Sequence, residues 1–188
     1  MSMADYGPPR VTLARLKSFA NVIHALMLRD IRTRMMGSAY GYLLVVLWPL
    51  SHILIIVLIH VYRGMATPYG DNVAVWVASG VVPFMCFSYI PRFTVLGVVQ
   101  NKPLLYFPRI SLTALIFSRA CIEILNSVLV VLCIILIFTA SGVTIDPRDP
   151  VQLCYALFVG MLLGLGFGML NSVIVALAPS WSTAVFLF

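Results

Sequence analysis

The chain has 188 residues, of which 62% are hydrophobic and 10% charged, and its formal net charge is +6. Soluble domains are about 45–50% apolar and about 25% charged, and a small globule cannot bury so much apolar surface. The composition therefore excludes an ordinary soluble domain and predicts an integral membrane protein.

The distribution of positive charge argues against a nucleic-acid partner. Half of the 12 basic residues precede the first long apolar segment, and these are Arg10, Arg15, Lys17, Arg29, Arg32 and Arg34. This placement is typical of a cytosolic N-terminus under the positive-inside rule. We expect no nucleic acid among the partners of this chain.

Residues 1–36 form the first predicted unit, a cytosolic leader followed by an amphipathic helix. From Thr12 to Met36 apolar residues recur at helical spacing, and basic residues that include Arg29, Arg32 and Arg34 decorate the other face. Such a pattern predicts a helix that lies in the membrane interface. A plain basic anchor beside the membrane is the alternative interpretation.

Residues 37–188 form the second predicted unit, a transmembrane domain. At about 1.5 Å per residue, its apolar segments are long enough to cross a hydrocarbon layer of about 30 Å. The predicted spans are 41–62, 73–95, 112–140 and 151–177, and residues 181–188 resemble the start of a fifth. The expected fold class is therefore all-α integral membrane, with an N-terminal interfacial helix and four spans.

The connections between the spans predict the orientation. The connection 96–111 carries Lys102 and Arg109, whereas 63–72 and 141–150 are not strongly basic. The positive-inside rule places 96–111 on the cytosolic side, together with the N-terminus, and the other two connections outside.

A row of small residues runs along one face of the fourth predicted span. Its members repeat every four positions and are Ala156, Gly160, Gly164, Gly168, Ser172 and Ala176. Small residues let helix backbones approach closely in lipid. The row therefore predicts tight helix packing, either within the chain or against a second copy.

Arg119 and Glu123 form a candidate polar pair in the third predicted span. They are four residues apart and share a helix face, so they can form an ion pair. One interpretation is a polar cavity or gate, because charges in a membrane usually face protein or water. Alternatively, Arg119 reaches the cytosolic interface and Glu123 neutralises it.

Several catalytic and metal-binding patterns are missing from the sequence. The chain has no GxxxxGK[ST] phosphate loop, GxSxG elbow or HExxH helix, and its four cysteines lack metal-ligand spacing. His52 and His60 are about 12 Å apart along a helix, too far to share one ion without other ligands. We expect no metal site, no catalytic residues and no enzymatic activity.

The predicted cytosolic connection 96–111 contains a run of large apolar residues, which we expect to be shielded from water by a partner. Four large apolar side chains follow one another between two prolines, in the segment Asn101, Lys102, Pro103, Leu104, Leu105, Tyr106, Phe107 and Pro108. Such a run would be costly if it faced water. This segment is therefore a candidate docking surface.

Three stretches together resemble the permease subunits of polysaccharide-exporting ABC transporters, and the capsular-polysaccharide class is the most similar. They are NKPLLYFPRISLTALIFSRACIEIL (101–125), LMLRDIRTRMMGSAYGYLLVVLWPLSHI (26–53) and SGVVPFMCF (79–87). The resemblance implies a homodimer of six-span permeases in the bacterial inner membrane. It also implies a separate cytosolic ATP-binding cassette subunit that holds ATP and magnesium, so this chain itself would carry no cofactor.

The resemblance implies roles for two segments. Residues 101–108 would couple the permease to the ATPase subunit, and the basic helix with Arg29, Arg32 and Arg34 would act as an interfacial gate helix near the mouth of the polysaccharide path. A polysaccharide substrate, in some cases lipid-linked, and periplasmic and outer-membrane export proteins complete the expected partners.

Other readings remain open from the sequence. The family continues through two further spans beyond Phe188, so a truncated chain or a fragment is expected. The cargo could instead be O-antigen, teichoic acid or a small drug. A non-transporting membrane scaffold and a membrane-embedded enzyme that uses His52 or His60 are the alternatives from other functional classes.

Overall fold

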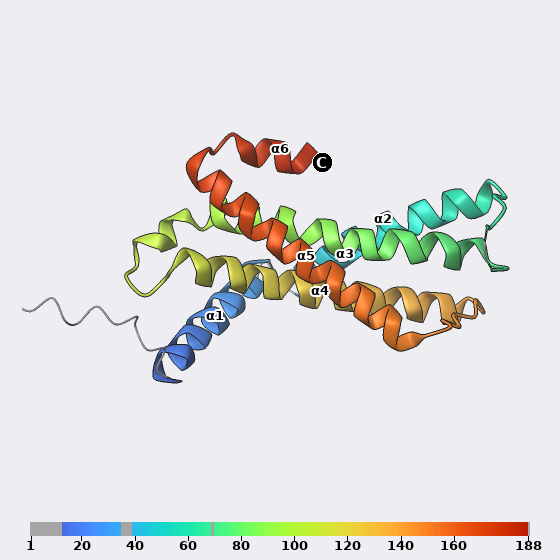
Figure 1. Ribbon diagram of the computed structural model, residues 1–188, viewed down its shortest axis with the longest axis horizontal. Coiled ribbons are helices and arrows are strands. Elements are labelled where there is room, and N and C mark those ends of the chain that lie inside the picture. The colour runs from blue at the N-terminus through green and yellow to red at the C-terminus, as the bar shows by residue number, and fades with distance from the viewer. Residues whose placement is uncertain (1–12, 35–38, 69, 188) are drawn as a thin grey trace, which may run out of the picture.

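The computed structural model describes residues 13–34, 39–68 and 70–187, and this part of the chain is built from helices (Figure 1). The leader 1–12 and residues 35–36 of the predicted amphipathic helix lie outside the described residues. The elements are α1 (Leu13–Arg34), α2 (Ala39–Tyr62), α3 (Val73–Gln100), the short 3₁₀ helix η1 (Lys102–Tyr106), α4 (Leu112–Ala140), α5 (Pro150–Leu177) and α6 (Trp181–Leu187).

The predicted fold class is confirmed. Four of the described helices, α2 to α5, are long and apolar enough to cross a membrane. Their bounds agree with the predicted spans except at α3, which continues to Gln100, past the predicted end at Val95. The predicted span ended at Val95 because it was already long enough to cross a membrane, although Leu96, Val98 and Val99 continue the apolar run.

Polar caps define where three of the spanning helices begin. The Asn72 side chain accepts a hydrogen bond from the Ala74 backbone N–H at 2.9 Å, and Ser111 Oγ accepts one from Ala114 N–H at 3.1 Å. Asp149 caps the start of α5 in the same way. Such side chains satisfy backbone donors that have no partner within the helix.

α3 lies at the centre of the arrangement and contacts α2, α4, α5 and α6. The long helices run roughly side by side, so their connections gather at two ends (Figure 1). The turn after α3, the turn between α5 and α6, and α1 lie at one end, whereas the 63–72 and 141–149 connections lie at the other. α1 contacts mainly α4.

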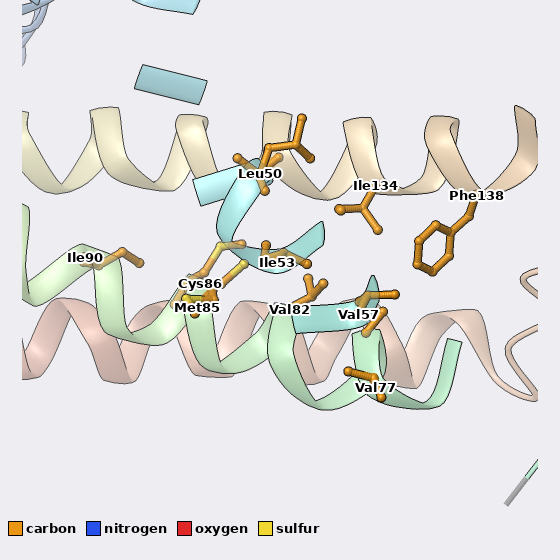
Figure 2. Close-up of a cluster of buried hydrophobic side chains, with 13 residues drawn as sticks. Leu50, Ile53, Val57, Val77, Val82, Met85, Cys86, Ile90, Ile134 and Phe138 are labelled. Carbon is orange, nitrogen blue, oxygen red and sulfur yellow. The ribbon is translucent and has the colours of Figure 1, made fainter. Parts of the chain in front are cut away.

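An apolar core joins α2, α3 and α4, with one buried residue from α5 (Figure 2). Its buried members are Leu50, Ile53, Val57, Val77, Ala78, Val82, Met85, Cys86, Ile90, Val130, Ile134, Phe138 and Met161. Many other large apolar side chains of these helices point outward. In lipid an outward apolar side chain carries no solvation penalty, so helix contacts depend on close packing instead.

The row of small residues on α5 packs against α3 over part of its length. A Cβ atom at Gly164 would lie 2.7 Å from the Phe87 carbonyl oxygen, and one at Gly168 would lie 3.2 Å from the Pro91 Cα atom. Ser172, one turn further on, is also buried. A Cβ atom added at Gly160 would have no atom of the described residues within 4 Å.

Candidate functional site

The turn after α3 is folded by a regular series of backbone hydrogen bonds. Leu104 N–H donates to the Asn101 carbonyl at 2.9 Å, Phe107 N–H to the Leu104 carbonyl at 3.1 Å, and Ile110 N–H to the Phe107 carbonyl at 3.0 Å. Each bond closes over three residues, the spacing of a 3₁₀ helix. The turn is therefore a compact element with a defined shape.

The apolar run in this turn divides into two pairs. Leu104 and Leu105 are partly buried and pack against a cluster from α1, α3 and α4 whose buried members are Leu26, Val98, Ala114, Leu115 and Ile116. Tyr106 and Phe107 point outward and are 89% and 60% exposed. Lys102, Pro103 and Pro108 are also exposed. The first pair anchors the turn, and the second pair is exposed at its surface.

Asn101 ties the turn to two helices. Its side chain is buried, with 7% exposed, and its amide donates to the Gly97 carbonyl of α3 at 2.8 Å. Its side-chain oxygen accepts a hydrogen bond from the guanidinium of Arg29 on α1. Asn101 is thus a structural connection between α3, the turn and α1, and it is not part of the exposed surface.

Arg119 on α4 is the centre of a second set of polar contacts. Its guanidinium forms an ion pair with Asp30 of α1, and it also donates to the Phe93 carbonyl and to the Gln100 side chain of α3, each at 3.2 Å. Only 6% of the residue is exposed. A single side chain therefore connects α1, α3 and α4 at the end where the turn lies.

The ion pair that the structure shows for Arg119 is with Asp30 of α1, whereas the pairing with Glu123 stays a prediction. Asp30 provides a carboxylate for Arg119 that sequence reasoning missed, whereas buried Glu123 accepts a hydrogen bond from the Asn126 amide at 3.4 Å. Asp30 has one signal in the sequence: it is the acidic residue within a helix whose other charged residues are basic.

Gly97 makes room for Arg119. A Cβ atom at this position would lie 2.6 Å from the Arg119 Cγ atom, which is closer than carbon atoms approach in proteins. The missing side chain lets the arginine cross the face of α3 and reach Asp30. Sequence patterns did not single out Gly97 or Gln100 as members of this site.

The polar contacts continue into a cavity of about 450 Å³ between α2, α3 and α4. The Tyr42 hydroxyl donates to the Asn126 side-chain oxygen at 2.7 Å, and Arg119 and Glu123 line the wall together with Asn126. Most of the remaining wall is aliphatic, with Trp48, Tyr89 and Phe93 as its aromatic members. Such a cavity can hold a polar group within otherwise apolar surroundings.

The remaining predicted residues lie apart from these contacts. Arg32 is exposed on α1, and the side chain of Arg34 lies outside the described part of that helix. His60 Nδ1 lies 2.8 Å from the Ile56 carbonyl of its own helix, and His52 is exposed. Among the residues that the structure describes, no group of three or more His, Cys, Asp or Glu could hold a metal ion.

The sequence of the chain is similar to those of known transport proteins. Two Escherichia coli proteins, both named polysialic acid transport protein KpsM, are 30% and 29% identical to the chain over 152 residues, or 81% of its length. The chain is similar to polysaccharide-transport proteins. This finding confirms the resemblance inferred from the sequence.

The similarity covers only part of these relatives. The chain spans 59% of the length of each E. coli protein. No protein-family model matches the chain. Together with the four helices that could cross a membrane, the similarity identifies a multi-pass membrane protein related to transport proteins.

Proposed function

We propose that the chain forms the membrane-spanning part of an ATP-driven exporter that moves capsular or related surface polysaccharide across the bacterial inner membrane. The N-terminus and the turn after α3 face the cytosol, two copies assemble around the path, and a separate cytosolic subunit hydrolyses ATP with magnesium. The similarity to polysialic acid transport proteins supports the cargo class.

The exposed pair Tyr106 and Phe107 is the observation that carries the mechanism. Both side chains project from a turn that Leu104, Leu105 and Asn101 hold against α1, α3 and α4. Exposed aromatic residues commonly provide most of the binding energy at protein interfaces, and a preformed turn loses little entropy on binding. This pair is the proposed contact with the ATPase subunit.

The proposed mechanism is mechanical coupling. When the ATPase subunits close on ATP, they displace Tyr106 and Phe107, and the turn transmits this displacement along two routes. One runs from Asn101 to Arg29 and α1, and the other runs through the apolar cluster to α4. ATP binding then biases an equilibrium between two arrangements of the helices.

Replacing both Tyr106 and Phe107 by Asp tests this proposal. We expect co-purification of the ATPase subunit and polysaccharide export to be lost together, with docking weakened at least about 30-fold if the pair is an interface hot spot. Leu105 is left intact because it is packed in the apolar cluster, so that its replacement would disturb folding as well as docking.

Met65→Asp is the matched control. Met65 is also an exposed apolar residue, but it lies in the connection at the opposite end of the helices. This variant should retain both docking and export. If the Tyr106 and Phe107 variant still docks and exports like the unmodified protein, the coupling proposal is wrong. Docking without flux in the unmodified protein, measured in vesicles with ATP, would instead assign it a scaffold role.

A further inference from the structure

A second cavity, of about 230 Å³, lies between α3, α5 and α6. It is separate from the Arg119 contacts, and the residues on its wall include Phe87, Arg92, Phe167, Asn171 and Trp181. The turn between α5 and α6 lies at the same end of the molecule as residues 101–110, the proposed coupling turn (Figure 1).

Arg92 is the charged group of this cavity, and no other described residue pairs with it. It lies in α3, a helix that could cross a membrane, yet it forms no hydrogen bond or ion pair with any residue that the structure describes. Arg119, by contrast, is bonded to Asp30, Phe93 and Gln100. An unpaired guanidinium in a membrane is costly, and charged residues in spans usually pair with another charge or a backbone carbonyl, or line a cavity.

The depth of Arg92 suits a ligand at the membrane surface. It precedes Gln100, the last residue of α3, by about two helical turns, which correspond to about 12 Å along the axis. A long arginine side chain can extend from such a depth towards the headgroup layer. The guanidinium is thus within reach of lipid headgroups on the side of the coupling turn.

The other groups in the wall leave Arg92 as the principal binding group. The Trp181 indole N–H donates to the Asn171 side-chain oxygen at 2.8 Å, and the Asn171 amide donates to the Phe167 carbonyl at 2.9 Å, so both polar groups are engaged. Phe87 and Phe167 meet edge to face at 5.7 Å. The cavity therefore combines one cation with aromatic walls.

We propose that this cavity binds the phosphate of a membrane lipid. The Arg92 guanidinium would hold the phosphate through paired N–H donors, and an acyl or isoprenoid chain would lie along Phe87 and Phe167. Basic pockets between spanning helices are known to bind lipid headgroups. An anionic phospholipid and the lipid anchor of a transported glycan share this phosphate chemistry, and binding of either requires neither transport nor the ATPase.

Fluorescence of Trp181 provides the test. The chain has three tryptophans, so Trp48→Phe and Trp76→Phe leave Trp181 as the single reporter in the purified full-length protein. In vesicles with brominated acyl chains, phosphatidylglycerol should quench Trp181 with an affinity about fivefold higher than phosphatidylcholine. Arg92→Gln should remove this preference, and Arg92→Lys should keep most of it.

Two further variants separate binding from folding. Ala184→Phe fills the cavity but keeps Arg92, because Ala184 lies in the cavity wall, and it should also lower quenching by phosphatidylglycerol. Arg148→Gln removes an exposed arginine from the 141–149 connection at the opposite end and should leave the preference intact. Equal quenching by the two lipids in the protein whose single tryptophan is Trp181 would overturn the proposal, as would an unchanged preference when Arg92→Gln is added.

Competition identifies the source of the phosphate. Unlabelled phosphatidic acid and a polyprenyl phosphate should each relieve the quenching, and the stronger competitor distinguishes a bulk phospholipid from an isoprenoid anchor. Inorganic phosphate at equal concentration should have no effect. Competition by inorganic phosphate would assign the site to a soluble anion and overturn the assignment to a lipid.

Discussion

Asp30 on α1 and Arg119 on α4 form a buried ion pair although 89 positions separate them in the sequence. This pair joins the amphipathic helix directly to a membrane-spanning helix. Arg119 also holds the last part of α3 through Phe93 and Gln100. Three helices therefore meet at one guanidinium, next to the turn that carries Tyr106 and Phe107.

Replacing either member of the ion pair should destabilise the protein strongly. In Asp30→Asn the arginine loses its buried counter-charge, and in Arg119→Gln the carboxylate does. Removing one partner of a buried pair costs about 3–5 kcal/mol. We expect each variant to lower the free energy of unfolding by this order, measured by denaturant titration of the purified protein in detergent micelles.

The double variant shows whether the two residues act together. Asp30→Asn with Arg119→Gln should cost less than the sum of the single changes, with a coupling energy of about 0.5–3 kcal/mol. Arg32→Gln is the control, because Arg32 is an exposed basic residue of the same helix as Asp30. Purely additive effects would show that the ion pair does not join α1 to α4 in solution.

Gly97→Ala should disturb the same contacts without removing any charge. The new methyl group would meet the Arg119 side chain, and that side chain cannot move freely because Asp30 and Gln100 hold it. Overpacking of this kind costs about 1–3 kcal/mol. Gly80→Ala on the same helix is the control, since no atom of the described residues lies within 4 Å of its Cβ position.

Two measurements show whether Gly97→Ala acts by displacing Arg119. If the methyl group displaces Arg119, Asp30→Asn should add little to the loss already caused by Gly97→Ala. If Gly97→Ala and Gly80→Ala unfold at the same denaturant concentration, Arg119 does not cross α3 at this glycine.

Gly164→Ala should weaken the contact between α5 and α3. The added Cβ would lie 2.7 Å from the backbone carbonyl of Phe87, and a backbone atom cannot move aside as a side chain can. We expect a loss of about 1–3 kcal/mol in the free energy of unfolding. Gly160→Ala, one turn away on the same face, should have little effect on the monomer because its Cβ position is open.

Cysteine labelling tests the predicted orientation. In a background with Cys86, Cys121, Cys133 and Cys154 replaced by Ala, Tyr106→Cys and Ala66→Cys place single thiols at exposed positions on opposite ends. A membrane-impermeant maleimide should label Ala66→Cys in intact spheroplasts and Tyr106→Cys only after lysis. Labelling of both thiols before lysis would contradict an inward-facing coupling turn.

The sequence predicted the helices well because lipid imposes a simple requirement on them. A span must be long, apolar and helical, since unpaired backbone groups are too costly in hydrocarbon. The regions 41–62 and 112–140 therefore agree closely with α2 and α4. The end of α3 was missed because membrane thickness fixes only a minimum length for a span, and the apolar run continues through Leu96, Val98 and Val99 beyond that length.

The tertiary contacts could be predicted only where they repeat along one helix. Gly164 and Gly168 stand out because their spacing matches a helix face, and Glu123 was singled out because it lies one turn from Arg119. Asp30 has no such relation to Arg119, because their proximity results from how α1 crosses α4. The division of the apolar run into partly buried Leu104 and exposed Tyr106 likewise depends on which helices lie beside the turn.

Asn101 is at once the cap of α3, the start of the coupling turn and the acceptor for Arg29. A ligand on the basic face of α1 and a protein that binds Tyr106 and Phe107 would therefore both shift the equilibrium between the two arrangements of the helices. Linkage requires each to alter the affinity of the other by the same factor. Under the proposed docking, the anionic lipid content of the membrane becomes an allosteric effector of ATPase recruitment.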